Sequence, residues 1–462
     1  AGVLEKAGDT GSKAVVVEAD IPESTSVSTT CAVYEGKNLE KQDYFTWASP
    51  ITSYLTKSPD GYLMRIQAGA IDNKALIEYY DTLYNLKKTV TVPLALPVFG
   101  SFYESDSNYY ILTGQNNSEK DNSKEVFCVT KYTKDWKVVG SCGIFGRVAI
   151  PFDGGSARMT MNGNYLFVRT CRERYDGHQD NVTFSVDTST MTIADSFIGT
   201  WDTTAGYVSH SFNQFIQVDN GTLLGVDHGD VYPRCFILLR YTTDISRGKF
   251  VPDFTHGENI CDRIVLMNYG NKGSGNYTAS SFGGFEYSSS SYLTAGNIDS
   301  GAQYSPRNVF VSCVPKNGGS PVVRYFTDYG GSDTDTATTP HLIKTGSDSF
   351  ILMWSNHGKV SYTALDGKGN QVGSIYTMKG NLSDCKPAVI NGKLIWYTWN
   401  NGTNVFYDVD LSDLSKNNAV KIVNGHKYTY GEIHDGAVEK KCSVCGKDFG
   451  PALVPKAIGY MK

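Results

Sequence analysis

Short stretches in which apolar and polar residues alternate recur along most of the chain, and polar turns separate them. A period of two is typical of β-strands that bury one face. Seven segments share one plan, in which a short strand and a turn rich in Gly, Asp, Asn or Ser precede a strongly apolar strand. These segments read SYLTKSPDGYLMRI, GSFYESDSNYYILTG, ARMTMNGNYLFVRT, NQFIQVDNGTLLGV, GGFEYSSSSYLTAG, HLIKTGSDSFILMW and PAVINGKLIWYTW.

A second hairpin follows each unit, as in VFCVTKYTKDWKVVGS and VFYDVDLSDLSKNNAVKIV. Two hairpins in series give four antiparallel strands, which make up one propeller blade. The pattern therefore predicts an all-β fold, a seven-bladed β-propeller of four-stranded antiparallel blades over residues 45–423. The first large residues after the seven turns are 44 to 69 residues apart, a variation that we assign to loops; they are Tyr62, Tyr110, Tyr165, Leu223, Tyr292, Phe350 and Leu394.

Composition and charge agree with this fold class and narrow the range of partners. The 462 residues include 30 Tyr, 21 Phe and 47 Gly, a mixture that favours strands and turns over helices. The net charge is −5, so there is no basic excess to attract a phosphate backbone, and nucleic acid is excluded as a partner. No apolar run approaches the roughly 18 residues that a membrane span requires, so we expect no membrane span.

The architecture resembles the β-propellers of secreted and surface proteins, and the resemblance covers most of the chain. The segment SPDGYLMR is similar to a turn of TolB-like propellers, but it occurs once. The sequence has no repeated box of the sialidase type and no Trp-Asp ending of the WD40 type. The resemblance therefore implies a fold and an extracellular location, and it assigns no catalytic residues.

Both ends of the chain differ from the repeated part. Residues 1–44 are predicted to form an N-terminal arm or linker, because the first thirty are polar and poor in large apolar residues. We expect another copy of the chain to hold this arm. Ten cysteines are scattered along the chain, which is compatible either with disulfides in an oxidising compartment or with small buried apolar side chains. Six Asn-x-Ser/Thr sequons would carry glycans only in a eukaryotic secretory pathway.

The C-terminal segment, residues 424–462, contains a Cys/His motif with the spacing His-x7-His-x7-Cys-x2-Cys. Two thiolates and two imidazoles can complete a tetrahedral zinc site, and a structural zinc would stabilise a segment too short for a core. The candidate ligands are His426, His434, Cys442 and Cys445. The alternatives are a disulfide between the two cysteines or free thiols.

This tail is similar to short repeats of Gram-positive surface proteins that run Cys-x-His-x-Tyr and later Cys-x-x-Cys-Gly. Asn424 stands where those repeats have their first Cys, so the ligand set departs from the pattern. The resemblance implies a Gram-positive source and an extracellular or cell-surface location.

Two segments, GVDHGDVYPR and RTCRERYDGHQDN, carry more charge than hairpin turns need, and the repeat places both on one loop face, in blades four and three. Three interpretations remain open: ion pairs that fix the loops, a ligand site, or acid-base catalysis. Asp227 and His228 should point to opposite sides unless Gly229 bends the chain. We expect one polar cluster between the two blades, with Asp230 coupled to Arg172. The candidate ligand-binding residues are Arg169, Arg172, Arg174, His178, His210, Asp227, His228, Asp230 and Arg234.

Taken together, these patterns favour an extracellular protein that acts through its propeller as a binding, adhesive or assembly module. The expected partners are other copies of the chain, surface proteins or glycans. The alternative is a glycan-active enzyme, a glycosidase or lyase, with its site on the loop face of blades three and four. No catalytic residue can be named from the sequence, and we favour the non-catalytic interpretation.

Overall fold

The computed structural model describes residues 3–6, 17–19, 28–30, 49–198, 211–229, 234–251, 261–269, 280–299, 306–330, 337–400, 403–424, 428–443 and 448–453. These residues form strands and turns, and none of them lies in a helix. Within these ranges there is accordingly no helix that could cross a membrane.

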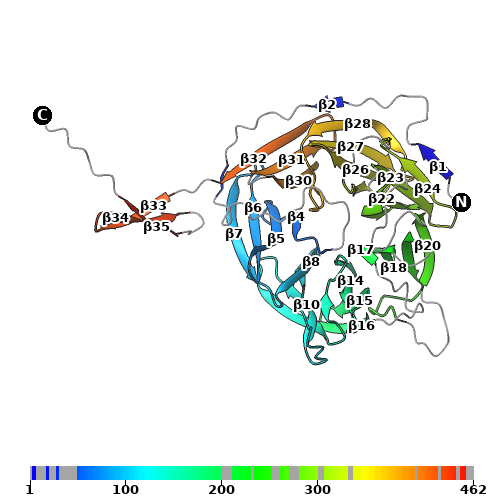
Figure 1. Ribbon diagram of the computed structural model, residues 1–462, viewed down its shortest axis with the longest axis horizontal. Helices are drawn as coiled ribbons and strands as arrows, with labels where there is room; N and C mark the ends of the chain where they lie inside the picture. The colour runs from blue at the N-terminus through cyan, green and yellow to red at the C-terminus, as the bar shows by residue number, and fades with distance from the viewer. Residues whose placement is uncertain are drawn as a thin grey trace.

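Seven antiparallel sheets surround a common centre, and each sheet is one blade, with its first strand innermost and its last strand outermost (Figure 1). In blade three the first strand is split into two short pieces, which both pair with the second strand. The strands of blades one to four are β4–β7 (Ser53–Lys57, Leu63–Ile71, Lys74–Tyr80, Leu86–Pro93), β8–β11 (Val98–Glu104, Tyr109–Gly114, Glu125–Tyr132, Val138–Phe145), β12–β16 (Ile150–Pro151, Arg158–Asn162, Tyr165–Glu173, Gln179–Asp187, Thr192–Ile198) and β17–β20 (Ser211–Asp219, Thr222–Gly229, Cys235–Tyr241, Cys261–Asn268).

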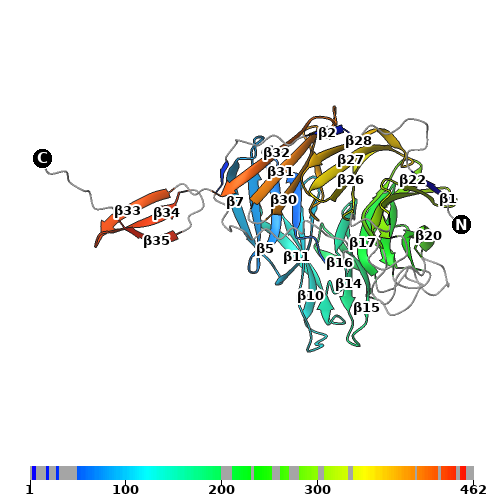
Figure 2. The same ribbon diagram turned by 45° about the horizontal axis from the view of Figure 1, so that its top comes forward.

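Blades five to seven complete the ring, and a separate three-stranded sheet near the C-terminus lies outside it (Figure 2). The strands of these blades are β21–β24 (Ser280–Tyr287, Ser291–Asp299, Arg307–Pro315, Val322–Tyr325), β25–β28 (His341–Gly346, Ser349–Asn356, Lys359–Asp366, Gln371–Lys379) and β29–β32 (Ala388–Ile390, Lys393–Asn400, Thr403–Asp410, Asn417–Asn424). The outer sheet consists of β33 (Tyr428–His434), β34 (Ala437–Cys442) and β35 (Asp448–Leu453).

Seven hydrophobic clusters hold the blades together, one at each interface between neighbours. Between blades one and two, for example, Ile66 packs in one cluster with Phe102 and Trp136. The indole of Trp136 also donates a hydrogen bond of 2.9 Å to the hydroxyl of Tyr79 across this interface. Each blade thus buries both of its faces, which a lone four-stranded sheet could not do.

The ring closes between blades seven and one, and the four antiparallel strands of each of these blades are consecutive in the chain. Tyr84 of blade one stacks on Phe406 of blade seven at 5.0 Å between ring centroids, and its hydroxyl donates a 2.6 Å hydrogen bond to Asp408. The guanidinium of Arg65 lies 4.0 Å from the ring centroid of Tyr397. Aromatic stacking and buried polar contacts therefore form the seam of the ring.

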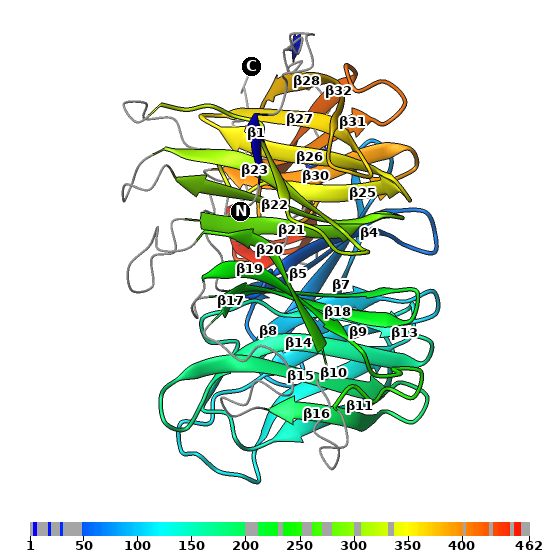
Figure 3. The same ribbon diagram turned by 90° about the vertical axis from the view of Figure 1, so that its right-hand side faces the viewer.

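Three short strands of the N-terminal arm extend the sheets of three successive blades. β1 (Val3–Lys6), β2 (Val17–Ala19) and β3 (Ser28–Thr30) pair in parallel with β24, β28 and β32, the outermost strands of blades five, six and seven. Figure 1 shows β1 and β2 on the outer rim, and Figure 3 shows β1 from the side of the ring. Although another copy of the chain was expected to hold the arm, these segments pair with blades of the same chain.

The predicted all-β propeller fold is confirmed. The seven large residues used to align the repeats lie in, or directly before, the second strand of a blade, as Tyr110 in β9 and Leu223 in β18 show. The sheets of the ring run from Ser53 to Asn424.

The hydrogen bond between Tyr84 and Asp408 predicts how the loss of one hydroxyl group changes the stability of the ring. In the Tyr84→Phe variant the stacking on Phe406 remains, but the buried Asp408 carboxylate loses a donor, so the free energy of unfolding should fall by about 1–3 kcal/mol. Denaturant unfolding measures this change. Tyr430→Phe, which alters an exposed tyrosine of the outer sheet, is the control and should leave ring stability unchanged. Equal stability of the two variants would contradict this account of the seam.

Candidate functional site

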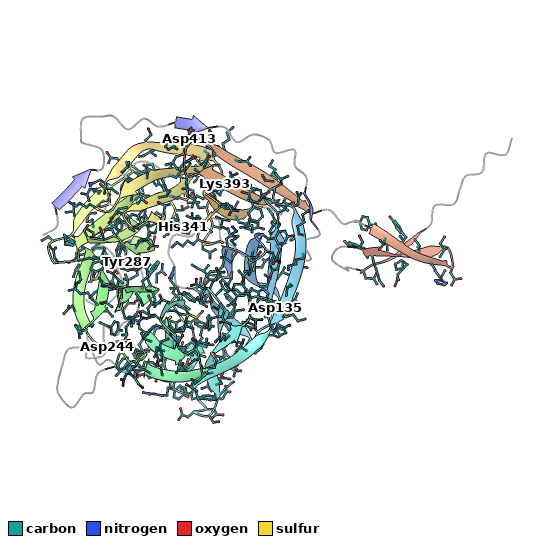
Figure 4. All side chains as sticks on the ribbon, turned by 180° about the vertical axis from the view of Figure 1, so that it is seen from behind. Asp135, Asp244, Tyr287, His341, Lys393 and Asp413 are labelled. Carbon is teal, nitrogen blue, oxygen red and sulfur yellow. The ribbon has the colours of Figure 1, made fainter. Side chains whose placement is uncertain are left out.

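A cavity of about 540 Å³ lies at the centre of the ring and is lined by the innermost strand of every blade. In Figure 4 the labelled His341 lies beside the central opening, whereas Asp135, Asp244 and Asp413 lie on the outer rim. Apolar and aromatic side chains form much of the wall; the rings that line it are Tyr54, Phe102, Tyr103, Phe215, Phe285 and Tyr287.

Arg158, at the start of β13, is a polar group of the wall that two blades hold in place. Its guanidinium carbon lies 3.7 Å from the ring centroid of Phe215. Its Nη1, with two N–H groups, lies within hydrogen-bonding distance of three acceptors: the Ser156 hydroxyl at 2.9 Å, the Asn213 side-chain oxygen at 2.7 Å and the Gln214 carbonyl at 2.5 Å. The neighbouring blades three and four therefore fix the position of this positive charge at the cavity.

Blade six supplies an imidazole to the wall, and its connection to blade seven supplies one negative and one positive side chain. Lys386 forms an ion pair of 3.1 Å with Glu286, and Asp384 also lines the cavity. The ring of His341 makes a 2.6 Å hydrogen bond with the Ser383 carbonyl. Burial, together with the positive charges of Lys386 and Arg158, lowers the pKa of His341 to about 4. His341 is therefore neutral near pH 7.

The two charged segments singled out in the sequence meet at a buried ion pair between blades three and four. Arg169 and Asp227 form two parallel hydrogen bonds of 2.9 and 2.6 Å, and both side chains are almost fully buried. Burial raises the pKa of the Asp227 carboxyl, and the Arg169 charge opposes that rise. A bidentate pair of this kind fixes the relative position of two blades.

A chain of buried hydrogen bonds connects this ion pair to the cavity. The Asn181 amide donates to Asp227 at 3.0 Å, and the Gln214 amide donates to Asn181 at 3.2 Å. The side-chain oxygen of Gln214 accepts a hydrogen bond of 2.8 Å from the Ser156 backbone, and Ser156 contacts Arg158. Blades three and four are thus joined by buried polar contacts of Arg169 and Asp227, and the inner end of this chain of hydrogen bonds holds the cavity arginine.

Other charged residues of blade three bond within their own hairpin. Arg172 binds Asp180 through contacts of 2.6 and 3.1 Å. Arg174 contacts Asp176 at 2.9 Å, and the exposed His178 lies 3.5 Å from Asp176. The expected coupling of Arg172 to Asp230 stays a prediction, because Asp230 lies outside the described ranges. His210 also lies outside them.

Asp227 and His228 lie in β18, not in a hairpin loop, so the placement in a loop was wrong. The same holds for Arg169 and Arg172, which lie in β14. The predicted alternation is seen, since His228 points away from Arg169 and packs against Phe282 of blade five.

The environment of His228 is apolar on one side and positive on the other. Burial, together with the charges of Arg307 and Arg234, lowers its pKa to about 3. Arg234 itself is buried directly before the third strand of blade four. His228 is thus a neutral group between blades four and five.

The outer sheet separates two of the four proposed zinc ligands. Cys442 pairs with Tyr428, whereas His434 pairs with Ala437 at the other end of the hairpin. Five residues of strand span about 16 Å, and zinc ligands lie only about 2.0–2.3 Å from the metal. His434 therefore cannot share one zinc with Cys442, and this part of the predicted ligand set is wrong. His426 and Cys445 lie outside the described residues.

Seven cysteines of the ring form no disulfide. Cys128, Cys142, Cys171, Cys235, Cys261, Cys313 and Cys385 are free thiols. Burial raises the pKa of the Cys142 and Cys235 thiols to about 12. For these seven residues the small apolar interpretation holds, and the disulfide interpretation does not.

The sequence analysis did not single out Arg158, His341, Asp384 or Lys386. These residues lie at or just before the first strand of a blade, where the repeat places the edge nearest the centre. Alignment of the seven first strands was the signal that could have found them, because each such strand faces the same cavity.

Comparisons with known proteins find similar folds at low sequence identity. No family model and no curated protein matches the chain. A protein from Lactobacillus plantarum is 9% identical with a TM-score of 0.48, over 81% of this chain and 95% of that one. The polysaccharide lyase Uly1 is 11% identical with a TM-score of 0.43, over 88% and 96%.

A prolyl endopeptidase is 10% identical with a TM-score of 0.42, over 78% of this chain. The chain spans about half the length of that protein, 47%. Since all of these TM-scores lie below 0.5, the fold assignment rests on the sheet topology.

The Arg169–Asp227 pair predicts strong coupling between blades three and four. Arg169→Leu and Asp227→Leu should each lower the free energy of unfolding by about 3–5 kcal/mol, because each leaves a buried charge without its partner. The double variant should lose much less than the sum. Denaturant unfolding of the four proteins gives the coupling energy.

The exposed pair Lys137–Asp135 is the matched control for this cycle. Its coupling should be no more than about 0.5 kcal/mol. Additive effects at Arg169 and Asp227 would show that the pair does not connect the two blades.

Proposed function

We propose that this chain is a non-catalytic binding module whose ligand occupies the central cavity of the propeller. The observation that carries the proposal is the convergence of all seven innermost strands on one cavity of about 540 Å³. Small-molecule sites are typically concave, mostly apolar and about 300–1,000 Å³ in volume, with a few fixed polar groups. The aromatic wall and the firmly held Arg158 have this character.

The titratable groups of the cavity favour binding over acid-base chemistry. Glycoside hydrolysis usually requires two carboxylates, and Asp384 carries the only carboxylate among the lining residues that the structure describes. A general base works best with a pKa near the working pH. His341 has a pKa of about 4 and is bonded to a backbone carbonyl, and burial raises the pKa of Tyr54.

We further propose that the module works outside the cell, where it binds surface proteins, glycans or other copies of the chain. The support is the similarity of the tail to repeats of Gram-positive surface proteins and of the architecture to secreted propellers. In this proposal the propeller supplies recognition, and the ends of the chain connect it to a surface or to an assembly.

Blocking the cavity tests the binding function. In Thr160→Trp a bulky ring on β13 would occupy the cavity, whereas Thr192→Trp places the same ring on the exposed outermost strand of the same blade. A panel of neutral and acidic sugars and aromatic acids is tested by thermal shift. A ligand should raise the melting temperature of the wild type and Thr192→Trp, and not that of Thr160→Trp.

Binding that is unaffected by Thr160→Trp would contradict the cavity as the site. Conversion of a bound sugar polymer to shorter products, followed by chromatography, would contradict the non-catalytic proposal and favour the glycan-active enzyme.

We propose that the tail binds a structural zinc through Cys442, Cys445 and His426. One equivalent of zinc should remain with the purified chain, and Cys442→Ser should lower it, since a thiolate ligand is lost. His434→Ala, at the far end of the hairpin, is the control and should retain the metal. Metal analysis of the three proteins decides the matter, and zinc content that is insensitive to Cys442→Ser would refute the proposal.

A further inference from the structure

The charged side chains at the central cavity balance one another. Arg158 and Lys386 line it with positive charge, and Asp384 lines it with negative charge. Glu286, the ion-pair partner of Lys386 at 3.1 Å, supplies a second carboxylate. These two positive and two negative groups leave no net charge among them, and the lowered pKa of His341 keeps that imidazole neutral.

Opposite charges act on the same group of the wall. Burial raises the pKa of the Tyr54 hydroxyl; the charge of Arg158 lowers that pKa, whereas the charge of Asp384 raises it. An ion that enters the cavity gives up hydration, and it meets no excess of opposite charge in return. The balance of charges therefore favours an uncharged ligand.

Two more lysines lie close to one ring of the wall, and both have partners. The Lys344 ammonium donates a 2.7 Å hydrogen bond to the Tyr287 carbonyl and lies 4.1 Å from the centroid of that ring. Lys316 pairs with Asp219 at 2.5 Å and lies 4.8 Å from the same centroid. Because lysines already lie over the Tyr287 ring, we assign that ring no ligand.

Uncharged polar groups of the wall retain capacity for hydrogen bonds. The hydroxyl of Thr160, on β13, makes no hydrogen bond within the described ranges. Gln217 donates from its amide nitrogen to the Phe285 carbonyl at 2.8 Å, while its side-chain oxygen accepts no bond in the part of the chain that the structure describes. The hydroxyls of Tyr54 and Ser101 share one hydrogen bond of 3.3 Å, although together they can donate two.

Apolar surface lies between these polar groups. The half-buried rings of Tyr54 and Tyr103 line the cavity from the neighbouring blades one and two, and Leu55 and Ile216 also line it. Aromatic side chains provide flat apolar contact area, and a tyrosine adds a polar tip. A pyranose ring has the matching character, with apolar C–H groups on its faces and hydroxyls around its rim. Such a ligand would use the apolar wall and the uncharged polar groups together.

We propose, on the basis of the binding function above, that the central cavity takes a neutral pyranose sugar. Its hydroxyls bond to the Thr160 hydroxyl and the Gln217 side-chain oxygen, and its ring packs against Tyr54. Uronic acids and amino sugars bind more weakly, because the paired charges of the wall offer no excess charge to either.

Calorimetric titration of the full chain with matched probes tests the proposal. The neutral probes are the methyl glycosides of glucose, galactose, mannose and N-acetylglucosamine. The charged probes are the uronate and the 2-amino sugar built on each of these rings, and cyclohexanol is a ring with a single hydroxyl. At least one neutral glycoside should bind about ten-fold or more tightly than its charged counterparts and than cyclohexanol. Its affinity should not change as salt is added, since no ion pair is formed.

Two variants locate the effect. Thr160→Val removes a hydroxyl but keeps the shape of the side chain, so it should weaken binding of the neutral sugar by about three- to ten-fold. Thr192→Val, on the outermost strand of the same blade, is the control and should leave binding unchanged. Glu286→Gln leaves Lys386 without its carboxylate, so it should raise the affinity for the uronate relative to the neutral sugar by about five-fold or more. Melting temperatures confirm that each variant is folded.

The outcomes separate this inference from the function on which it rests. A uronate, an amino sugar or cyclohexanol that binds as tightly as the neutral glycoside would overturn the neutral-sugar proposal and leave the binding function intact. Sugar affinity that is unchanged in Thr160→Val would also overturn it, as would a charge preference that is unchanged in Glu286→Gln. If no neutral glycoside binds, the proposal fails, while the wider thermal-shift panel still decides the binding function. Sugar binding that persists in Thr160→Trp would overturn both.

Discussion

The structure depends on the requirement that each blade has neighbours on both sides. A four-stranded sheet with two apolar faces is stable in water only when both faces are covered. Seven interfaces, each with its own hydrophobic cluster, meet this requirement by closing the ring. The cavity is a geometric result of the same closure, because the innermost strands approach the centre and do not meet there.

Polar contacts give this apolar framework its precise geometry. Contacts among Leu, Val and Phe have no preferred direction, whereas a bidentate pair such as Arg169–Asp227 has one good arrangement. The hydrogen bonds through Asn181, Gln214 and Ser156 extend that constraint to Arg158. Interblade packing therefore supplies stability, and buried polar chains define the position of the groups at the centre.

The sequence was sufficient for the architecture because its signals are local. Alternation and turn residues identify each hairpin, and seven repeats of one plan lead to a closed ring. The opposite orientation of Asp227 and His228 also followed from strand periodicity alone. The partner of Arg169 did not, because pairing across blades joins residues 58 positions apart and leaves no periodic signal. The cavity residues come from seven separate segments, and their common position appears only after the ring closes.

The N-terminal arm has a consequence for the order of events when the chain is made. Its strands are synthesised first, yet their pairing partners lie in the last three blades; Val3 pairs with Val322, and Ser28 pairs with Ile422. The three pairings seen in the structure can all be present only after β32 has been translated. Contacts of such long sequence separation form slowly. A nascent chain that stops before β32 leaves at least one arm strand without the edge to which it binds.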